Sequence, residues 1–175
     1  MKRASWLALL AGGICLAPLA GCGYTQKMTL PSGIRTIHVE TFQNKVTLGR
    51  FYAYEPGLEI KITNAVINRL QQDGNLKVVG REEADAALEG DLIAFDQEGT
   101  RFTGLERIEE YRLYVVVALR LKNVKSGQLI WEENNFSGDA SYFLTDPRAV
   151  SRTFATDLAI ERLAHSVVDR IVEDW

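Results

Sequence analysis

Cysteine and histidine are scarce in this sequence, which contains two of each among 175 residues. Both cysteines lie near the amino terminus, while His38 and His165 are far apart along the chain. The sequence also has no HExxH motif and no GxSxG motif. Nothing in it therefore indicates a catalytic nucleophile or a metal site, and we expect a protein that is not an enzyme and has no cofactor.

Three glutamate doublets, at 82–83, 109–110 and 132–133, raise the alternative of a glycosidase, which uses two carboxylates. Adjacent residues of a strand point to opposite faces of the sheet, so a doublet does not supply two converging groups. The doublets therefore indicate solvated surface. A hydrolase with an unrecognised site remains an alternative.

An excess of positive charge is also absent, because 20 Lys and Arg residues stand against 23 Asp and Glu residues, for a formal net charge of −3. Surfaces that follow nucleic-acid phosphates normally show a basic excess. The composition therefore disfavours nucleic-acid binding, although a local basic cluster can still bind an acidic ligand.

The chain lacks an unbroken apolar run of the roughly 20 residues that span a bilayer. Its longest apolar stretch, residues 6–20, is interrupted by two glycines and a proline, and it follows Lys2 and Arg3. A short apolar run after basic residues and before small residues is typical of a cleaved secretory signal peptide, here residues 1–21. Its removal also takes away Lys2 and Arg3, which leaves 154 residues with a formal charge of −5.

Leu19-Ala20-Gly21-Cys22 resembles the bacterial lipobox, in which the leader is cut before the cysteine and the sulfur receives a diacylglycerol. Cys15 follows the bulky Ile14 and is expected to leave with the leader. The diacylglycerol at Cys22, together with an acyl chain on the new amino terminus, would give more than the two lipid signals that stable anchoring needs. Residues 22–33 form a polar tether that reaches at most roughly 40 Å when extended, so the domain is expected to work close to its membrane.

Periodicity predicts one domain over residues 34–175. Strands are expected at 34–42, 76–79, 84–95, 111–122 and 128–140. Helical spacing predicts one helix with Pro56 at its first position and its end at Asp73-Gly74, and a second helix capped by Asp146 with Pro147 at its first position. This order predicts an α/β two-layer sandwich, with both helices packed on one face of a mostly antiparallel sheet of four to five strands.

The clearest strand is 111–122, in which five alternating apolar residues are expected to face the core: Leu113, Val115, Val117, Leu119 and Leu121. Gly127 is expected to permit the positive φ of a hairpin turn. The apolar stripe of the last helix is expected to begin with Phe154, and His165 should be half-buried beside it. Two aromatic clusters, at 51–54 and 142–144, either cover the ends of the core or form a contact surface.

Several short motifs occur in order along the mature chain. They are Gly21-Cys22-Gly23-Tyr24, then Leu30-Pro31, IRTIHVE from Ile34, QQDGNLKVV, Ala84-Asp85 before Leu88-Glu89-Gly90, Tyr111 in its long strand, Ser126-Gly127 before Ile130-Trp131, and Arg162-Leu163-Ala164. Their combination resembles the LPS-assembly lipoprotein family, LptE. The likeness spans nearly the whole mature chain.

The resemblance implies a lipoprotein on the periplasmic side of the outer membrane. Such a protein occupies the lumen of an LptD-like β-barrel, acts as its plug and assembly partner, and itself contacts lipopolysaccharide. Gly23 after the lipidated cysteine, in place of aspartate, is similar to the outer-membrane sorting signal. A lipid- or glycan-binding lipoprotein that acts without a barrel is the alternative.

The resemblance also implies that basic residues before the long central strand and at the start of the last helix contact lipopolysaccharide. Arg101 and Arg148 are the nearest positions, and guanidinium groups suit phosphate because they form paired hydrogen bonds. Arg107 and Arg112 are comparable candidates. Ordinary solvated arginines are the alternative interpretation.

Overall fold

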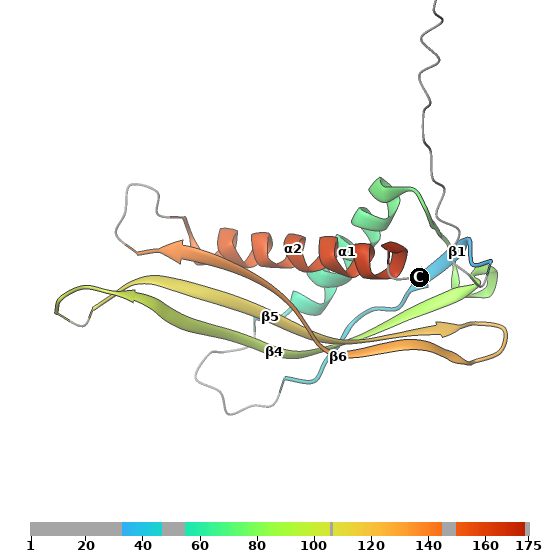
Figure 1. Cartoon of the computed structure of the whole chain (residues 1–175), viewed down its shortest axis with the longest axis horizontal. Helices are drawn as coiled ribbons and strands as arrows, with labels where there is room; N and C mark the ends of the chain where they lie inside the picture. Colours follow the sequence, from blue (N-terminus) through green and yellow to red (C-terminus); the bar gives the residue numbers. More distant parts are fainter. Residues whose placement is uncertain (1–32, 47–54, 106, 145–149, 174–175) are drawn as a thin grey trace, which may run out of the picture.

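The computed structural model describes residues 33–46, 55–105, 107–144 and 150–173. They form a two-layer α/β structure, with a six-stranded sheet as one layer and two helices on one of its faces as the other (Figure 1). The elements are β1 (Thr36–Val39), β2 (Gln43–Asn44), α1 (Leu58–Asp73), β3 (Lys77–Val78), the short 3₁₀ turn η1 (Arg81–Glu83), β4 (Ala86–Phe102), β5 (Ile108–Asn123), β6 (Leu129–Phe143) and α2 (Arg152–Glu173). Neither helix in these ranges is long and apolar enough to cross a membrane.

The sheet is mixed and has the strand order β3-β1-β4-β5-β6, with β2 also paired to β4. The pairs β1–β3, β1–β4 and β2–β4 are parallel, whereas β4–β5 and β5–β6 are antiparallel. The prediction of two helices on one face is confirmed, but that of a mostly antiparallel sheet of four to five strands is wrong in detail. Alternating polarity reveals which face of a strand is buried, not its direction, and the helix α1 between β1 and β3 allows a parallel return.

The two long hairpin strands β5 and β6 agree well with the alternating pattern. Leu113, Val115, Val117, Leu119 and Leu121 are all buried, as predicted. The turn between the strands has Gly127 at a φ of 66°. A hairpin register is therefore specified by both the buried face and the turn.

Strand β4 differs from its prediction in length and in its buried face. It continues seven residues past Phe95, and its pairing with β5 is irregular between Leu92 and Ala94. Such a bulge lets two residues oppose one and exchanges the faces beyond it, so Phe95 is buried where Ala94 was expected. The extra length carries the β4–β5 hairpin past the start of α2 (Figure 1).

Helix α1 ends as predicted but begins later. Gly74 adopts the left-handed conformation with a φ of 75°, and its N–H donates to the Leu70 carbonyl at 3.1 Å. The helix starts at Leu58 after Gly57, so Pro56 precedes the helix and is not its first residue. The buried face includes Ile62, which faces the core with the rest of the apolar stripe.

Helix α2 begins at Arg152, so the predicted start at Pro147 with a cap at Asp146 is wrong. Both of those residues lie outside the described ranges. The Ser151 hydroxyl instead accepts a hydrogen bond from the Phe154 N–H at 3.1 Å, which is an N-cap contact.

The helix packs directly on β6. A Cβ atom at Gly138 would lie 2.3 Å from the carbonyl oxygen of Ala159. Only glycine therefore permits this close approach between helix and strand.

Candidate functional site

Exposed apolar side chains gather at one end of the molecule. The described residues leave seven large apolar side chains exposed, and five of them belong to the β4–β5 hairpin, the end of β6 and the start of α2. They are Phe102 (56 % exposed), Leu105 (78 %), Leu144 (50 %), Val150 (36 %) and Phe154 (56 %). These three parts of the chain lie toward the same end in Figure 1. We call this group, together with Arg101 and Arg107, the amphiphilic end.

Arg101 lies near the end of β4 and directly precedes the exposed Phe102 in the sequence. Its Nε is 3.7 Å from Glu110 Oε2, and its guanidinium carbon is 5.6 Å from the centre of the Phe143 ring. The side chain remains 58 % exposed, so neither contact removes it from solvent. A single long ion pair leaves most guanidinium donors able to bind an anion.

The hairpin turn beside Arg101 has its own hydrogen bonds. The Thr103 hydroxyl accepts from the N–H groups of Leu105 at 3.2 Å and Arg107 at 3.3 Å. The Thr103 N–H in turn donates to the Arg107 carbonyl at 2.8 Å. Thr103 thereby holds an exposed leucine and an exposed arginine at the tip of the projecting hairpin.

The structure separates the predicted site residues. Arg101 and Arg107 both lie at the amphiphilic end. Arg112 belongs instead to the open face of the sheet, where its Nε donates to Asp139 Oδ2 at 2.7 Å. Cys22 and Arg148 lie outside the described residues, so their roles remain predictions.

The aromatic cluster at 142–144 is divided between the core and the surface. Tyr142 is buried and stacks on Tyr111 with ring centres 5.5 Å apart, so it covers the core. Phe143 is half-buried beside Arg101, and Leu144 is exposed. The cluster at 51–54 lies outside the described residues.

Sequence reasoning missed the contribution of Phe154 to this end. Its spacing placed it in the apolar stripe of the last helix, but the side chain is exposed, whereas the adjacent Ala155 is fully buried. Arg152 was not singled out either, and its guanidinium carbon lies 5.4 Å from the centre of the Phe95 ring. The only available signal was the juxtaposition of an aromatic and an arginine near a helix start.

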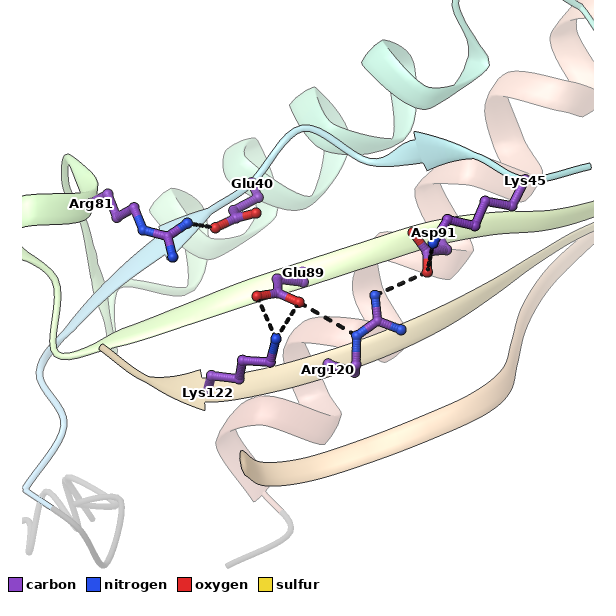
Figure 2. Close-up of polar contacts among 7 residues, drawn as sticks. All are labelled: Glu40, Lys45, Arg81, Glu89, Asp91, Arg120 and Lys122. Atoms are coloured by element: carbon purple, nitrogen blue, oxygen red, sulfur yellow. Dashed lines mark hydrogen bonds and ion pairs between the residues drawn. The ribbon is translucent and has the colours of Figure 1, made fainter. Parts of the chain in front are cut away.

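A second polar cluster lies on the sheet face away from the helices (Figure 2). Asp91, whose side chain is only 8 % exposed, accepts hydrogen bonds from Arg120 Nη2 at 2.9 Å and Lys45 Nζ at 3.1 Å. Glu89 accepts from Lys122 Nζ at 2.7 Å and from Arg120 Nε at 3.4 Å. Arg120 therefore connects the two carboxylates on the neighbouring strand.

These carboxylates remain ionised at neutral pH. The hydrogen bond from Lys122 is the main cause that lowers the pKa of Glu89. Burial, the largest influence on Asp91, raises its pKa, but the contacts with Arg120 and Lys45 together outweigh it and the pKa is lowered. A general acid needs a pKa near the working pH. The cluster is therefore suited to joining β2, β4 and β5, and not to acid catalysis.

Both histidines contact polar groups of neighbouring residues. His165 is exposed and not half-buried as expected; its Nδ1 lies 2.7 Å from Asp169 Oδ2 and its Nε2 lies 3.1 Å from Arg69 Nη2. His38 Nδ1 lies 3.1 Å from the Val79 carbonyl. Within the described ranges no group of three or more histidine, cysteine, aspartate or glutamate side chains is placed to hold a metal.

The motif Ala84-Asp85 before Leu88-Glu89-Gly90 has structural roles. Asp85 Oδ2 accepts from the backbone N–H groups of Arg35 at 3.1 Å and Thr36 at 3.2 Å, which fixes the start of β1 against β4. Leu88 is fully buried. Gly90 lies against Phe42, because a Cβ atom there would be 2.2 Å from the ring.

The fold and the amphiphilic end define a small two-layer α/β protein with an exposed apolar surface that carries arginines. A sequence model of the family described as Lipopolysaccharide-assembly, LptE, matches residues 34–175. The chain belongs to this family of LPS-assembly lipoproteins, as the sequence motifs predicted. No curated protein sequence matches the chain.

Solved structures with the same fold are distant in sequence. Protein XCC0632 from Xanthomonas campestris is 13 % identical with a TM-score of 0.58, over 79 % of this chain and 84 % of that one. Hypothetical protein CT253 from Chlamydia trachomatis is 12 % identical with a TM-score of 0.53, over 78 % and 95 %. A minor lipoprotein from Acinetobacter baumannii is 12 % identical with a TM-score of 0.51, over 80 % and 94 %. At such identities these likenesses concern the fold alone.

Proposed function

We propose that this chain is an outer-membrane lipoprotein, anchored through Cys22, that plugs an LPS-translocating β-barrel and helps it to insert lipopolysaccharide. Membership of the lipopolysaccharide-assembly family supports the general role. The lipobox and the short tether at 22–33 support action close to a membrane. An LptD-like barrel is the expected partner.

The amphiphilic end is proposed to contact the glycolipid. Lipopolysaccharide carries acyl chains beside phosphorylated sugars, so a surface that binds it needs apolar and cationic groups side by side. Phe102 and Leu105 supply exposed apolar area in the same hairpin as Arg101, whose guanidinium carbon lies 5.6 Å from the centre of the Phe143 ring. Paired hydrogen bonds from a guanidinium suit a phosphate. This juxtaposition is the single observation that carries the proposed contact.

Reversal of the charge at Arg101 tests the contact. Arg101→Glu should weaken binding to purified lipopolysaccharide about tenfold or more, because it removes a charge-assisted hydrogen bond and places a second carboxylate beside Glu110. Arg148→Glu should have a similar effect if the start of the last helix contributes. Fluorescence titration with lipopolysaccharide micelles gives the dissociation constants.

The matched control is Lys77→Glu, which makes the same charge change in β3, away from the amphiphilic end. Unchanged binding by both arginine variants, or an equal loss in Lys77→Glu, would remove the arginines from the site. Tight binding by the chain alone, with no barrel recovered from the membrane, would favour the lipoprotein that works without a barrel.

A further inference from the structure

A groove of about 520 Å³, lined by polar residues together with three apolar ones, runs between α1 and α2. Both helices lie on the same side of the sheet (Figure 1). None of the residues that line the groove belongs to the amphiphilic end. Its walls carry the carboxamides of Asn64, Asn68 and Gln72 from α1, opposite Asp157, Glu161 and His165 from α2. Its apolar lining consists of Ala65, Ile160 and Ala164.

The three carboxamides form a row. Residues four apart in a helix lie one above the other on the same face, so Asn64, Asn68 and Gln72 span two turns, about 12 Å along the helix axis. They make no hydrogen bond with any residue that the structure describes, and the same is true of the Glu161 carboxylate. Each carboxamide offers two donors and an acceptor.

Two ion pairs connect the helices along the groove. Lys61 Nζ lies 3.0 Å from Asp157 Oδ1, and Arg69 Nη2 lies 3.9 Å from Asp169 Oδ1 while also contacting His165. Arg69 Nε is buried and has no hydrogen-bond partner in the described part of the chain. The lining thus contains two cations, Lys61 and Arg69, and two carboxylates, Asp157 and Glu161, which balance in formal charge.

We infer that this groove binds a neutral, hydroxyl-rich saccharide chain. A balanced charge gives no net attraction to phosphate, whereas unpaired donors and acceptors in a row match the alternating donor and acceptor character of sugar hydroxyls. The small apolar side chains of Ala65 and Ala164 leave room for the C–H face of a ring. A partner helix would instead need a continuous apolar stripe, which the polar walls do not provide.

The inference goes beyond the proposed function and does not depend on it, because the groove shares no residue with the amphiphilic end. Two sources share this chemistry, a glycolipid and a free envelope glycan. Three lipid-free probes distinguish these sources: maltohexaose for the shared chemistry, chitohexaose for an N-acetylated chain, and a neutral polysaccharide released from lipopolysaccharide by mild acid.

The test uses the full-length chain in a zwitterionic detergent, since sugar-headed detergents would compete for the groove. The side-chain ¹⁵N–¹H signals of the three carboxamides should shift saturably with maltohexaose. A shift with chitohexaose as well would indicate an N-acetylated envelope glycan, and a shift with the released polysaccharide would indicate the glycolipid. Asn68→Ala should weaken binding about tenfold, as the loss of one net hydrogen bond implies. Gln71→Ala, which removes an exposed carboxamide of α1 outside the groove, should leave binding unchanged.

Two results would overturn the inference. One is the absence of any carboxamide shift with all three probes. The other is equal affinity of the unsubstituted chain, Asn68→Ala and Gln72→Ala, with backbone spectra showing that each variant is folded. In either case Arg101→Glu could still weaken lipopolysaccharide binding, so failure of this inference is distinct from failure of the proposed function.

Discussion

At the scale of single residues, the motif glycine Gly90 lets β4 approach the core ring of Phe42. Gly90→Ala should lower the free energy of unfolding by about 1–3 kcal/mol, because the new methyl would lie 2.2 Å from a ring that is 2 % exposed. Urea unfolding measures the change. Gly104→Ala is the matched control, since no atom lies within 4 Å of its added Cβ. A Gly90→Ala unfolding midpoint equal to that of the control would show that the Phe42 ring moves aside without loss of stability.

Asp85 should make stability depend on pH. The backbone N–H of Arg35 is the largest cause that lowers its pKa to about 2, with the Thr36 hydroxyl next. An unfolded aspartate has a pKa of about 3.9, so the stabilisation is present above about pH 4 and is lost as the pH falls toward 2. Asp85→Asn should flatten this part of the curve in unfolding experiments at pH 2–6. Parallel curves for the two proteins would contradict this role.

At the scale of elements, the start of α2 distinguishes the sequence prediction from the structure. Ser151→Ala should cost about 1 kcal/mol because it removes the side-chain acceptor of the Phe154 N–H. Asp146→Ala, the cap that the sequence favoured, should leave the unfolding midpoint unchanged. Chemical unfolding followed by circular dichroism compares the two. The reverse order of effects would place the helix start at Pro147.

The elements also show why part of the fold was predictable. Five alternating apolar residues in β5 were enough to identify a strand and its buried face, because that face has a strict period of two. Strand β2 has only two residues, too few to show a period, whereas the equally short β3 lies within the strand predicted at 76–79. The bulge after Leu92 arises from pairing with β5, which a local pattern does not contain.

The candidate site was less predictable than the fold. Arg101 was reached through a family resemblance, whereas its neighbours Leu105 and Phe154 were identified only from their exposure. Phe154 directly precedes the row of buried residues Ala155, Ala159 and Leu163 in α2, so it lies outside the face that meets the core. A helical spacing read from the sequence did not resolve this difference of one residue.

At the scale of the whole molecule, the core, the open face of the sheet and the amphiphilic end have different roles. Buried side chains from the sheet and both helices form one core, and charged side chains on the open face join neighbouring strands (Figure 2). The β4–β5 hairpin, which forms part of the amphiphilic end, projects past the start of α2 and carries the exposed Phe102 and Leu105. A protein arranged in this way is suited to act by contact with other molecules.

The central claim, that this lipoprotein works as the partner of a barrel, is tested most directly by co-purification from solubilised outer membrane. The chain should bring down a much larger β-barrel protein in a stable complex. Recovery of the chain alone, under conditions that keep other barrel complexes together, would contradict the account.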